Sequence, residues 1–364
     1  MNSTLKKLVF LILIISNFSS ICWAQEGQNK ISVLVIDSPI DYSHPDLVEY
    51  KPEIKPCNLV TGQNFTDVFI MDTSSFEDWE HGTHVSGIIA SHLNKNSENK
   101  VVIHNGVFFP PANDEKDGED DSVNDIKKQI REEVQLMEEY IRKTKPKVVN
   151  MSFGESSTQL LMSIIFAQAM AELDGISKKQ ALSNHMNIFN DTNDYKSDLM
   201  KKMMAKFPDT LFVIAAGNDH TDLDRTNEKY NFRNHNQFLR KLSRGKLKGV
   251  HTYLSQINLP NTIVVGSVDA KKIKPASFTN HSNKHVDIFA EGDKIMSTAP
   301  GGNYLELSGT SMAAPQVSGV AASILQENPS MTASEVKNKI IEDASTHFRL
   351  RPYVVEGRLL NVSK

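Results

Sequence analysis

The chain has 364 residues, of which 39% are hydrophobic, so it can bury the core of one large α/β domain or of two ordinary ones. This composition excludes a disordered or low-complexity protein. The formal charge of −4 gives no basic surface of the kind that nucleic-acid binding needs, so we expect no nucleic-acid partner.

Residues 1–24 have the layout of a cleavable secretory signal peptide. Two lysines precede an apolar run from Leu8 to Ile15, and the small residue Ala24 stands at the expected cleavage point. The run is too short to span a bilayer comfortably, so we expect no membrane span after cleavage. The sequence therefore predicts export to the periplasm or the extracellular space, with a mature chain that begins at Gln25.

The first predicted strand ends on an acid. Lys30–Asp37 is a continuous β-branched run, which is typical of a parallel strand buried on both faces. Asp37 falls at its C-terminal end, where the catalytic groups of open α/β sheets collect. Alternatively, Asp37 only caps the turn that Ser38 and Pro39 predict.

Residues 81–90 (HGTHVSGIIA) predict a helix of small residues with a histidine at its start. His81 and His84 are spaced i and i+3, which would allow a metal pair, but no carboxylate at matching spacing supports one. In the other interpretation, one histidine is a general base at a helix N-terminus and the other is a hydrogen-bonded core residue.

Helices and buried strands then alternate. An apolar period of 3.6 predicts a helix over about 122–145, and a strand pattern runs from Lys147 to small residues at Gly154. Two further strand patterns begin at Leu211 and Thr262. This alternation is typical of βαβ units, so it predicts an α/β fold.

Two long segments interrupt the alternation, at about 155–207 and 219–258. The first contains two helical patterns, over 159–173 and 195–206, around a polar middle at 184–193. The second is polar and basic, so we expect a surface insertion.

Two helices are predicted near the C-terminus. Residues 309–319 (GTSMAAPQVSG) place Ser311 at the start of a helix whose small residues allow close packing, and unpaired amides there favour negative charge. Ser311 is therefore a candidate nucleophile, although the Gly-Thr-Ser run could be only a helix cap. A capping box that begins at Thr332 predicts the second helix, to about Ala344.

Asp37, His81 and Ser311 follow one of the chain orders known for Asp-His-Ser triads. Their blocks, VIDS, HGTHVSG and GTSMAAP, resemble the three signature blocks of the subtilisin-like serine peptidases, the subtilases. The resemblance runs from about Ile31 to Asn361. It implies a three-layer subtilisin-like fold, with a mostly parallel central sheet and helices on both faces, and one catalytic domain over 25–364 that carries the two insertions.

The resemblance also implies roles for the site residues. Ser311 would attack a peptide carbonyl to form an acyl-enzyme, His81 would move the proton, and Asp37 would hold the imidazole. His84 would then be structural. Asn218 matches the family's oxyanion-hole asparagine.

Substrate contacts are implied in the same way. Ser152, Phe153 and Gly154 match the edge strand that pairs with the backbone of an extended peptide. Asp219 follows the oxyanion asparagine, and an acidic loop at 113–122 precedes the helix from Ser122, a position that in relatives borders the non-primed subsites. We therefore expect a modest preference for basic substrate residues; alternatively, solvent screens both acidic surfaces and they have no effect.

Pro39 and Gln316 depart from the family pattern, which usually has a glycine and a histidine there, but neither position touches a catalytic atom. The expected function is a secreted, monomeric serine endopeptidase that acts on proteins or peptides. The alternative is a catalytically silent scaffold that holds a peptide; an α/β-hydrolase esterase is disfavoured because its Gly-Xaa-Ser-Xaa-Gly elbow is absent. No cofactor is required, although structural calcium is possible at Asp46 and the loop 94–99.

Overall fold

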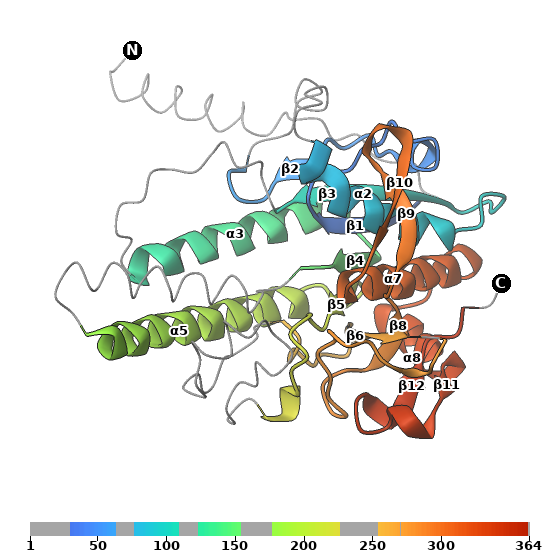
Figure 1. The fold of residues 1–364 in the computed structure, drawn as a ribbon. Coiled ribbons are helices and arrows are strands. Elements are labelled where there is room, and N and C mark those ends of the chain that lie inside the picture. Colours follow the sequence, from blue (N-terminus) through green and yellow to red (C-terminus); the bar gives the residue numbers. More distant parts are fainter. Residues whose placement is uncertain are drawn as a thin grey trace, which may run out of the picture.

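A central, mostly parallel sheet organises the chain (Figure 1). The computed structural model describes residues 30–62, 76–108, 123–153, 177–225, 254–269 and 271–362. In these residues ten strands form the sheet, in the order β11-β12-β8-β6-β5-β4-β1-β3-β2, with β7 paired to β6; β9 and β10 form a separate hairpin. Only the β11–β12 and β6–β7 pairs of the sheet are antiparallel.

The strand bounds follow the chain in order: β1 Lys30–Asp37, β2 Cys57–Asn58, β3 Lys100–Val107, β4 Val148–Met151, β5 Leu211–Ala215, β6 Thr262–Asp269, β7 Lys274–Pro275, β8 Ile288–Glu291, β9 Ile295–Ala299, β10 Asn303–Leu307, β11 Ser345–Thr346 and β12 Arg358–Leu359. The helix bounds are α2 Phe76–Ser91, α3 Val123–Thr144, α5 Lys178–Ala205, α7 Thr310–Glu327 and α8 Ala333–Asp343.

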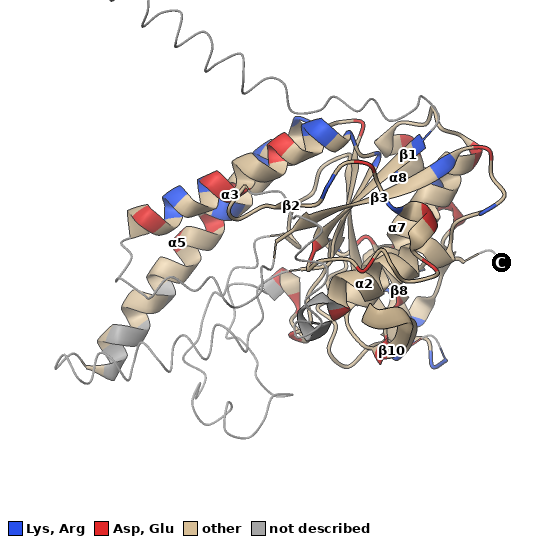
Figure 2. Ribbon diagram, turned by 90° about the horizontal axis from the view of Figure 1, so that it is seen from above, with Lys and Arg blue, Asp and Glu red and all other residues tan. Residues whose placement is uncertain are grey.

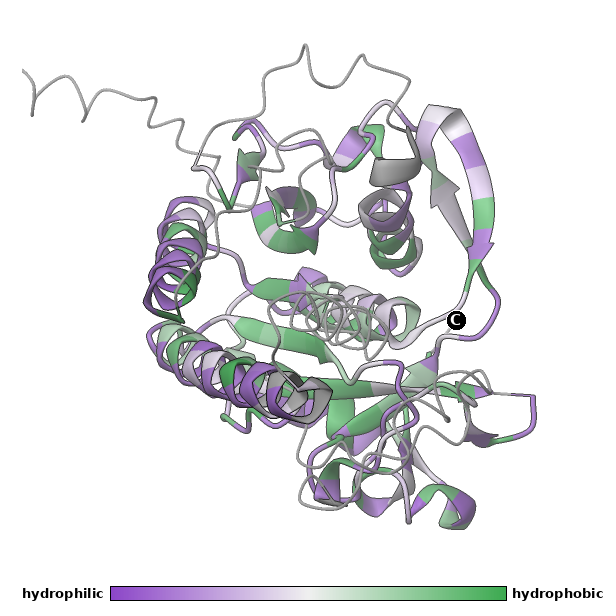
Figure 3. Cartoon of the chain, turned by 60° about the vertical axis from the view of Figure 1, so that its left-hand side comes forward, coloured by the Kyte–Doolittle hydropathy of each residue, from purple (hydrophilic) through white to green (hydrophobic). Residues whose placement is uncertain are grey.

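Helices cover both faces of the sheet, so the predicted α/β, three-layer architecture is confirmed. α2, α7 and α8 pack on one face, and α3 and α5 lie side by side on the other (Figure 3). Charged residues are spread along α3 and α5 (Figure 2), and Glu138 of α3 forms ion pairs with Arg142 and Lys206. None of the helices in the described ranges is both long and apolar enough to cross a membrane.

Side-chain alternation along β1 separates the two cores. Val33 and Val35 belong to the core under α2 and α7, whereas Leu34 and Ile36 belong to the core under α3 and α5. Because successive side chains of a strand point to opposite faces, Asp37 falls on the same face as Val35. The carboxylate therefore lies on the side of the sheet that carries α2 and α7.

The first predicted insertion was only partly correct. The polar middle at 184–193 does not separate two helices, because it lies inside the continuous helix α5. Most of its described side chains are exposed or half-buried, so a polar sequence suits a helix that packs through one face. The predicted helix at 159–173 lies outside the described residues.

The second predicted insertion, at about 219–258, is not wholly on the surface as expected. Leu223, Leu254 and Ile257 are at most 4% exposed and belong to the core, so both ends of the segment are part of the fold. Residues 226–253 lie outside the described ranges, as do the predicted signal peptide and the acidic loop at 113–122.

A hairpin that the sequence pattern did not predict holds helix α2 in place. The Ser297 and Thr298 hydroxyls of β9 donate hydrogen bonds to the His84 and Thr83 carbonyls of α2, each at 2.8 Å. Gly87 lies against the same two hydroxyl oxygens, so close that a Cβ there would overlap both. The helix can approach the hairpin only because residue 87 has no side chain.

We therefore expect Gly87→Ala to destabilise the fold. The added methyl group displaces two hydroxyls that are already hydrogen-bonded, and the cost should exceed the helix-propensity gain of alanine, for a net loss of about 1–3 kcal/mol. Urea unfolding measures the difference. Ser91→Ala, at an exposed position of the same helix, should change stability by less than about 0.5 kcal/mol. Equal stability of Gly87→Ala and the parent would contradict the close contact.

Candidate active site

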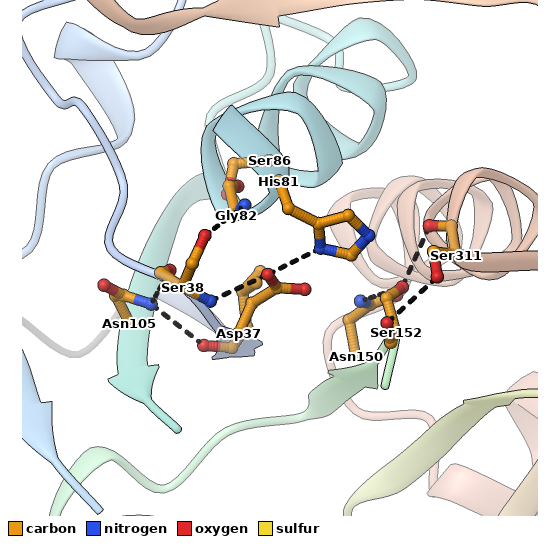
Figure 4. Close-up of polar contacts among 10 residues, drawn as sticks. Asp37, Ser38, His81, Gly82, Ser86, Asn105, Asn150, Ser152 and Ser311 are labelled. Carbon is orange, nitrogen blue, oxygen red and sulfur yellow. Dashed lines mark hydrogen bonds and ion pairs between the residues drawn. The ribbon is translucent and has the colours of Figure 1, made fainter. Parts of the chain in front are cut away.

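Three neighbouring parallel strands deliver polar groups to one edge of the sheet. β5, β4 and β1 are adjacent, and their C-terminal ends lead to Asn218, Ser152 and Asp37 respectively. Because the carboxyl ends of parallel strands share an edge, these residues gather where ligands bind in α/β folds. α2 and α7 add His81 and Ser311 from the covering layer (Figure 4).

Asp37 and His81 form a short, directed contact. His81 Nδ1 lies 2.7 Å from Asp37 Oδ1, which also accepts the Ser38 amide at 2.7 Å. The Asp37 side chain is fully buried, whereas that of His81 is 37% exposed. Since a carboxylate only accepts, Nδ1 carries a proton, and the neutral ring then has Nε2 free to accept one.

Helix α2 begins earlier than the sequence predicted. It starts at Phe76, so His81 lies in its second turn and not at the N-terminus that the general-base interpretation assumed. A run of small residues indicates the part of a helix that packs closely against its neighbours. In α2 this part does not include the start of the helix. The contact with β1 is close because Gly82 donates its amide to Ser38 Oγ at 2.8 Å, and a Cβ on Gly82 would overlap the Ser38 carbonyl.

The two histidines of α2 have opposite pKa shifts. Burial tends to lower the pKa of His81, but the charge of Asp37 and its hydrogen bond outweigh burial, so the pKa lies above 6.5. For His84, burial dominates and the pKa falls below 6.5. His84 Nε2 lies 3.0 Å from both the Ile295 and Leu305 carbonyls of the hairpin. His84 is thus a buried residue bonded to the hairpin, whereas the role of His81 as a proton carrier stays a prediction.

Ser311 is the second residue of α7 and exchanges hydrogen bonds with Ser152. The Ser311 hydroxyl donates to the Ser152 carbonyl, and the Ser152 hydroxyl donates to the Ser311 carbonyl, both at 3.0 Å. That carbonyl is available because Pro315, four residues on, has no amide hydrogen to give it.

The His81 ring lies between Asp37 and Ser311 (Figure 4). Since the Ser311 hydroxyl donates to the Ser152 carbonyl, proton transfer to His81 needs that hydroxyl hydrogen to turn away from Ser152. Catalytic hydrogen bonds often tighten only when substrate binds, so this geometry is compatible with a nucleophile and base.

Asn150, which the sequence pattern did not single out, joins β4 to α7. Its Nδ2 donates to Ser152 Oγ at 2.9 Å, and its Oδ1 accepts from Ser318 Oγ at 2.8 Å. Asn150 is fully buried. Its signal in the sequence is an amide residue inside an otherwise apolar strand, where a buried polar group needs partners.

Asn218 is oriented by the residue that precedes the candidate nucleophile. The Thr310 amide and hydroxyl both donate to Asn218 Oδ1, at 2.8 and 3.0 Å. An amide hydrogen can only be donated, which identifies this atom as the oxygen of the carboxamide. The Asn218 NH₂ group is therefore turned away from Thr310, and the side chain can donate to an oxyanion.

The residues predicted to contact the substrate lie in different surroundings. Ser152 touches Ser311, but the Phe153 ring is 6% exposed and stacks on Phe108 with a centroid distance of 4.9 Å. Gly154 lies outside the described residues. Asp219 is 6% exposed, so it is not at the surface as expected, and the acidic loop 113–122 lies outside the described residues. The preference for basic substrate residues stays a prediction.

The described residues contain no group of three or more His, Cys, Asp or Glu side chains that could hold a metal ion. Asp46 Oδ2 accepts the Tyr304 hydroxyl at 2.6 Å. In the loop 94–99, the Asn94 and Asn99 carbonyls each accept from Gln326 Nε2 at 3.1 Å. Calcium usually takes six to eight oxygen ligands, and these oxygens accept hydrogen bonds from side chains in this structure. Calcium binding stays a prediction.

The fold and site together define a hydrolase with a serine nucleophile, and comparison with known proteins agrees. The sequence model of the Subtilase family matches residues 28–357. The chain belongs to this family and is a serine-type endopeptidase.

Curated relatives include two bacterial peptidases. The chain is 26% identical to subtilisin of Bacillus pumilus over 339 residues, which cover 92% of the chain and 90% of that protein. It is 27% identical to an intracellular serine protease of Paenibacillus polymyxa, over 84% of the chain and 69% of the relative.

Solved structures share the fold. The A-subunit of the AB5 toxin from E. coli matches with a TM-score of 0.56 and 20% identity, covering 92% of this chain and 90% of that one. A cold-adapted subtilisin-like serine proteinase matches with a TM-score of 0.51 and 20% identity, covering 92% and 89%.

The contact between His81 and Asp37 predicts a titration. In a Ser311→Ala protein, NMR should place the His81 pKa above 6.5, and Asp37→Asn should lower it because the raising charge is lost while burial remains. His92, whose Nε2 contacts Gln316, should keep its lowered pKa and serves as the control. No response of His81 to Asp37→Asn would exclude the coupling.

Proposed function

We propose that the chain is an exported serine endopeptidase that cleaves peptide bonds through an acyl-enzyme formed on Ser311. His81 takes the serine proton and returns it to the leaving amine, and Asp37 fixes the tautomer and stabilises the imidazolium. The observation that supports this most is the 2.7 Å contact between a buried carboxylate and an imidazole beside a serine at a helix start.

The proposed oxyanion hole combines Asn218 and the Ser311 amide. Thr310 fixes the carboxamide of Asn218 with its NH₂ group outward, so the donor is oriented before any charge develops. Preoriented donors stabilise a tetrahedral intermediate without reorganisation during the reaction.

The alternative, a catalytically silent peptide-binding scaffold, has less support. Loss of activity would remove selection on the candidate triad and oxyanion residues, yet all four positions carry the residues that the chemistry requires. We further propose that the enzyme acts on proteins or extended peptides as a monomer and without a required cofactor.

Labelling with a fluorophosphonate probe tests the function directly. The parent protein should label, and Ser311→Ala should abolish labelling while the fold is retained, as circular dichroism would show. A folded parent that never labels would favour the silent scaffold. Labelling that persists in Ser311→Ala would mean that another residue is the nucleophile.

The candidate triad should also act as a unit. We expect Ser311→Ala and His81→Ala each to remove most of the activity, and the double variant to lose little more than either, since each change disables the same proton transfer. Hydrolysis of a peptide anilide measures all three. Losses that multiply would contradict a shared mechanism.

Asn218→Ala should lower kcat far more than it raises KM, because the amide binds the transition state better than the substrate. Loss of one oxyanion donor typically lowers kcat by about 100- to 1,000-fold. Steady-state kinetics on the same anilide separates kcat from KM. A change confined to KM would place Asn218 in substrate binding.

A further inference from the structure

The loop 216–221, which carries Asn218, is hydrogen-bonded through the side chain and the backbone of one buried residue, Asn280. Four hydrogen bonds join them: Asn280 Nδ2 donates to the Ala216 carbonyl (3.0 Å), Oδ1 accepts from the amides of Asp219 (3.0 Å) and Thr221 (2.9 Å), and the Asn280 amide donates to the Gly217 carbonyl (2.8 Å). Partners therefore lie on both sides of Asn218 in the chain.

The fit between Asn280 and the loop is close. Asn280 is 1% exposed, and both polar atoms of its side chain are used. Gly217 has φ +101°, and a Cβ there would overlap Asn280 Nδ2. This left-handed region favours glycine, and the missing side chain at Gly217 leaves room for the Asn280 carboxamide.

Asn280 is itself fixed to the central sheet. In the turn that carries it, Ala276 donates its amide to the Ser267 carbonyl at 3.0 Å, and Thr279 Oγ1 accepts the Ser267 amide at 2.9 Å. Ser267 lies in the buried strand β6. A continuous set of hydrogen bonds thus runs from β6 through Asn280 to the loop.

We propose that Asn280 is a positioning residue for the oxyanion hole, an inference that rests on the proposed function of Asn218. Thr310 fixes the side chain of Asn218, and Asn280 fixes the backbone that carries it. Loss of the Asn280 carboxamide would remove three of the four hydrogen bonds and keep only the backbone bond to the Gly217 carbonyl. The Asn218 NH₂ group would then be held less firmly where the oxyanion forms. A displacement of about 1 Å in a catalytic group can cost about 100-fold in rate.

A double-mutant cycle tests the proposal. Asn280→Ala should lower kcat by about 10- to 100-fold with little change in KM. In an Asn218→Ala background the same change should lower kcat by less than about threefold, because the donor that it positions is gone. Hydrogen exchange at the Asp219 and Thr221 amides, which lose their acceptor, should accelerate whether or not the protein is active.

Asn261→Ala is the matched control. Asn261 is also a buried asparagine, and its Nδ2 donates to three carbonyls, those of Met204, Phe207 and Thr210, at 2.9 to 3.2 Å. It precedes β6, at the edge of the sheet opposite the site. Its loss should lower the melting temperature and leave kcat unchanged.

Multiplicative losses in the cycle, or a kcat loss no larger than that of Asn261→Ala, would overturn the proposal while the parent's activity and labelling still support the function. A parent that neither hydrolyses nor labels would instead refute the function. If Asn280→Ala does not fold, Asn280→Asp keeps the acceptor for Asp219 and Thr221 and repeats the cycle with a smaller expected loss. Failure of both to fold beside a folded Asn261→Ala would make Asn280 purely structural.

Discussion

Close packing of helix α7 against the sheet is the constraint on which the site depends. The residues of α7 that face the sheet are small and fully buried, among them Ala313, Ala314 and Ala321, so the helix axis lies near the strands. Only at that separation can the Ser152 and Ser311 backbones exchange hydrogen bonds with each other's side chains. A larger residue at any of these three positions would move the candidate nucleophile, Ser311, away from His81, which α2 and β1 hold in place.

Buried amides fix the remaining distances. Asn150 joins β4 to α7, and Asn280 joins the turn after β7 to the loop after β5. Burial of an amide is costly unless its hydrogen bonds are made, and here both polar atoms of each side chain have partners. Such groups contribute less to net stability than apolar ones would. Their hydrogen bonds are directional, however, so they specify one arrangement of the strands and helices, which apolar contacts alone would not.

How far the sequence predicts this site depends on whether the signal is local. β1, β4 and β5 are apolar runs that end in polar residues, so their type and the residues at their ends followed from pattern. The start of α2 at Phe76 did not, because the small residues after His81 report close packing and not a helix boundary. The burial of Asp219 and of Asn280 was missed for one reason: it depends on a contact between positions about sixty residues apart, which no local pattern records.

The contact between Asp37 and His81 stabilises the fold most at a pH below the range in which His81 can act as a base. A histidine whose pKa is raised on folding contributes stability that is fully present below its unfolded pKa and is lost as the pH rises through its folded pKa. Action as a general base requires the neutral imidazole, which predominates only above that folded pKa. The pair therefore adds least to folding in the pH range where His81 can accept a proton. There the alignment of the ring depends on the Nδ1 hydrogen bond to Asp37 and on the contact of Gly82 with Ser38, which titration of the imidazole leaves in place.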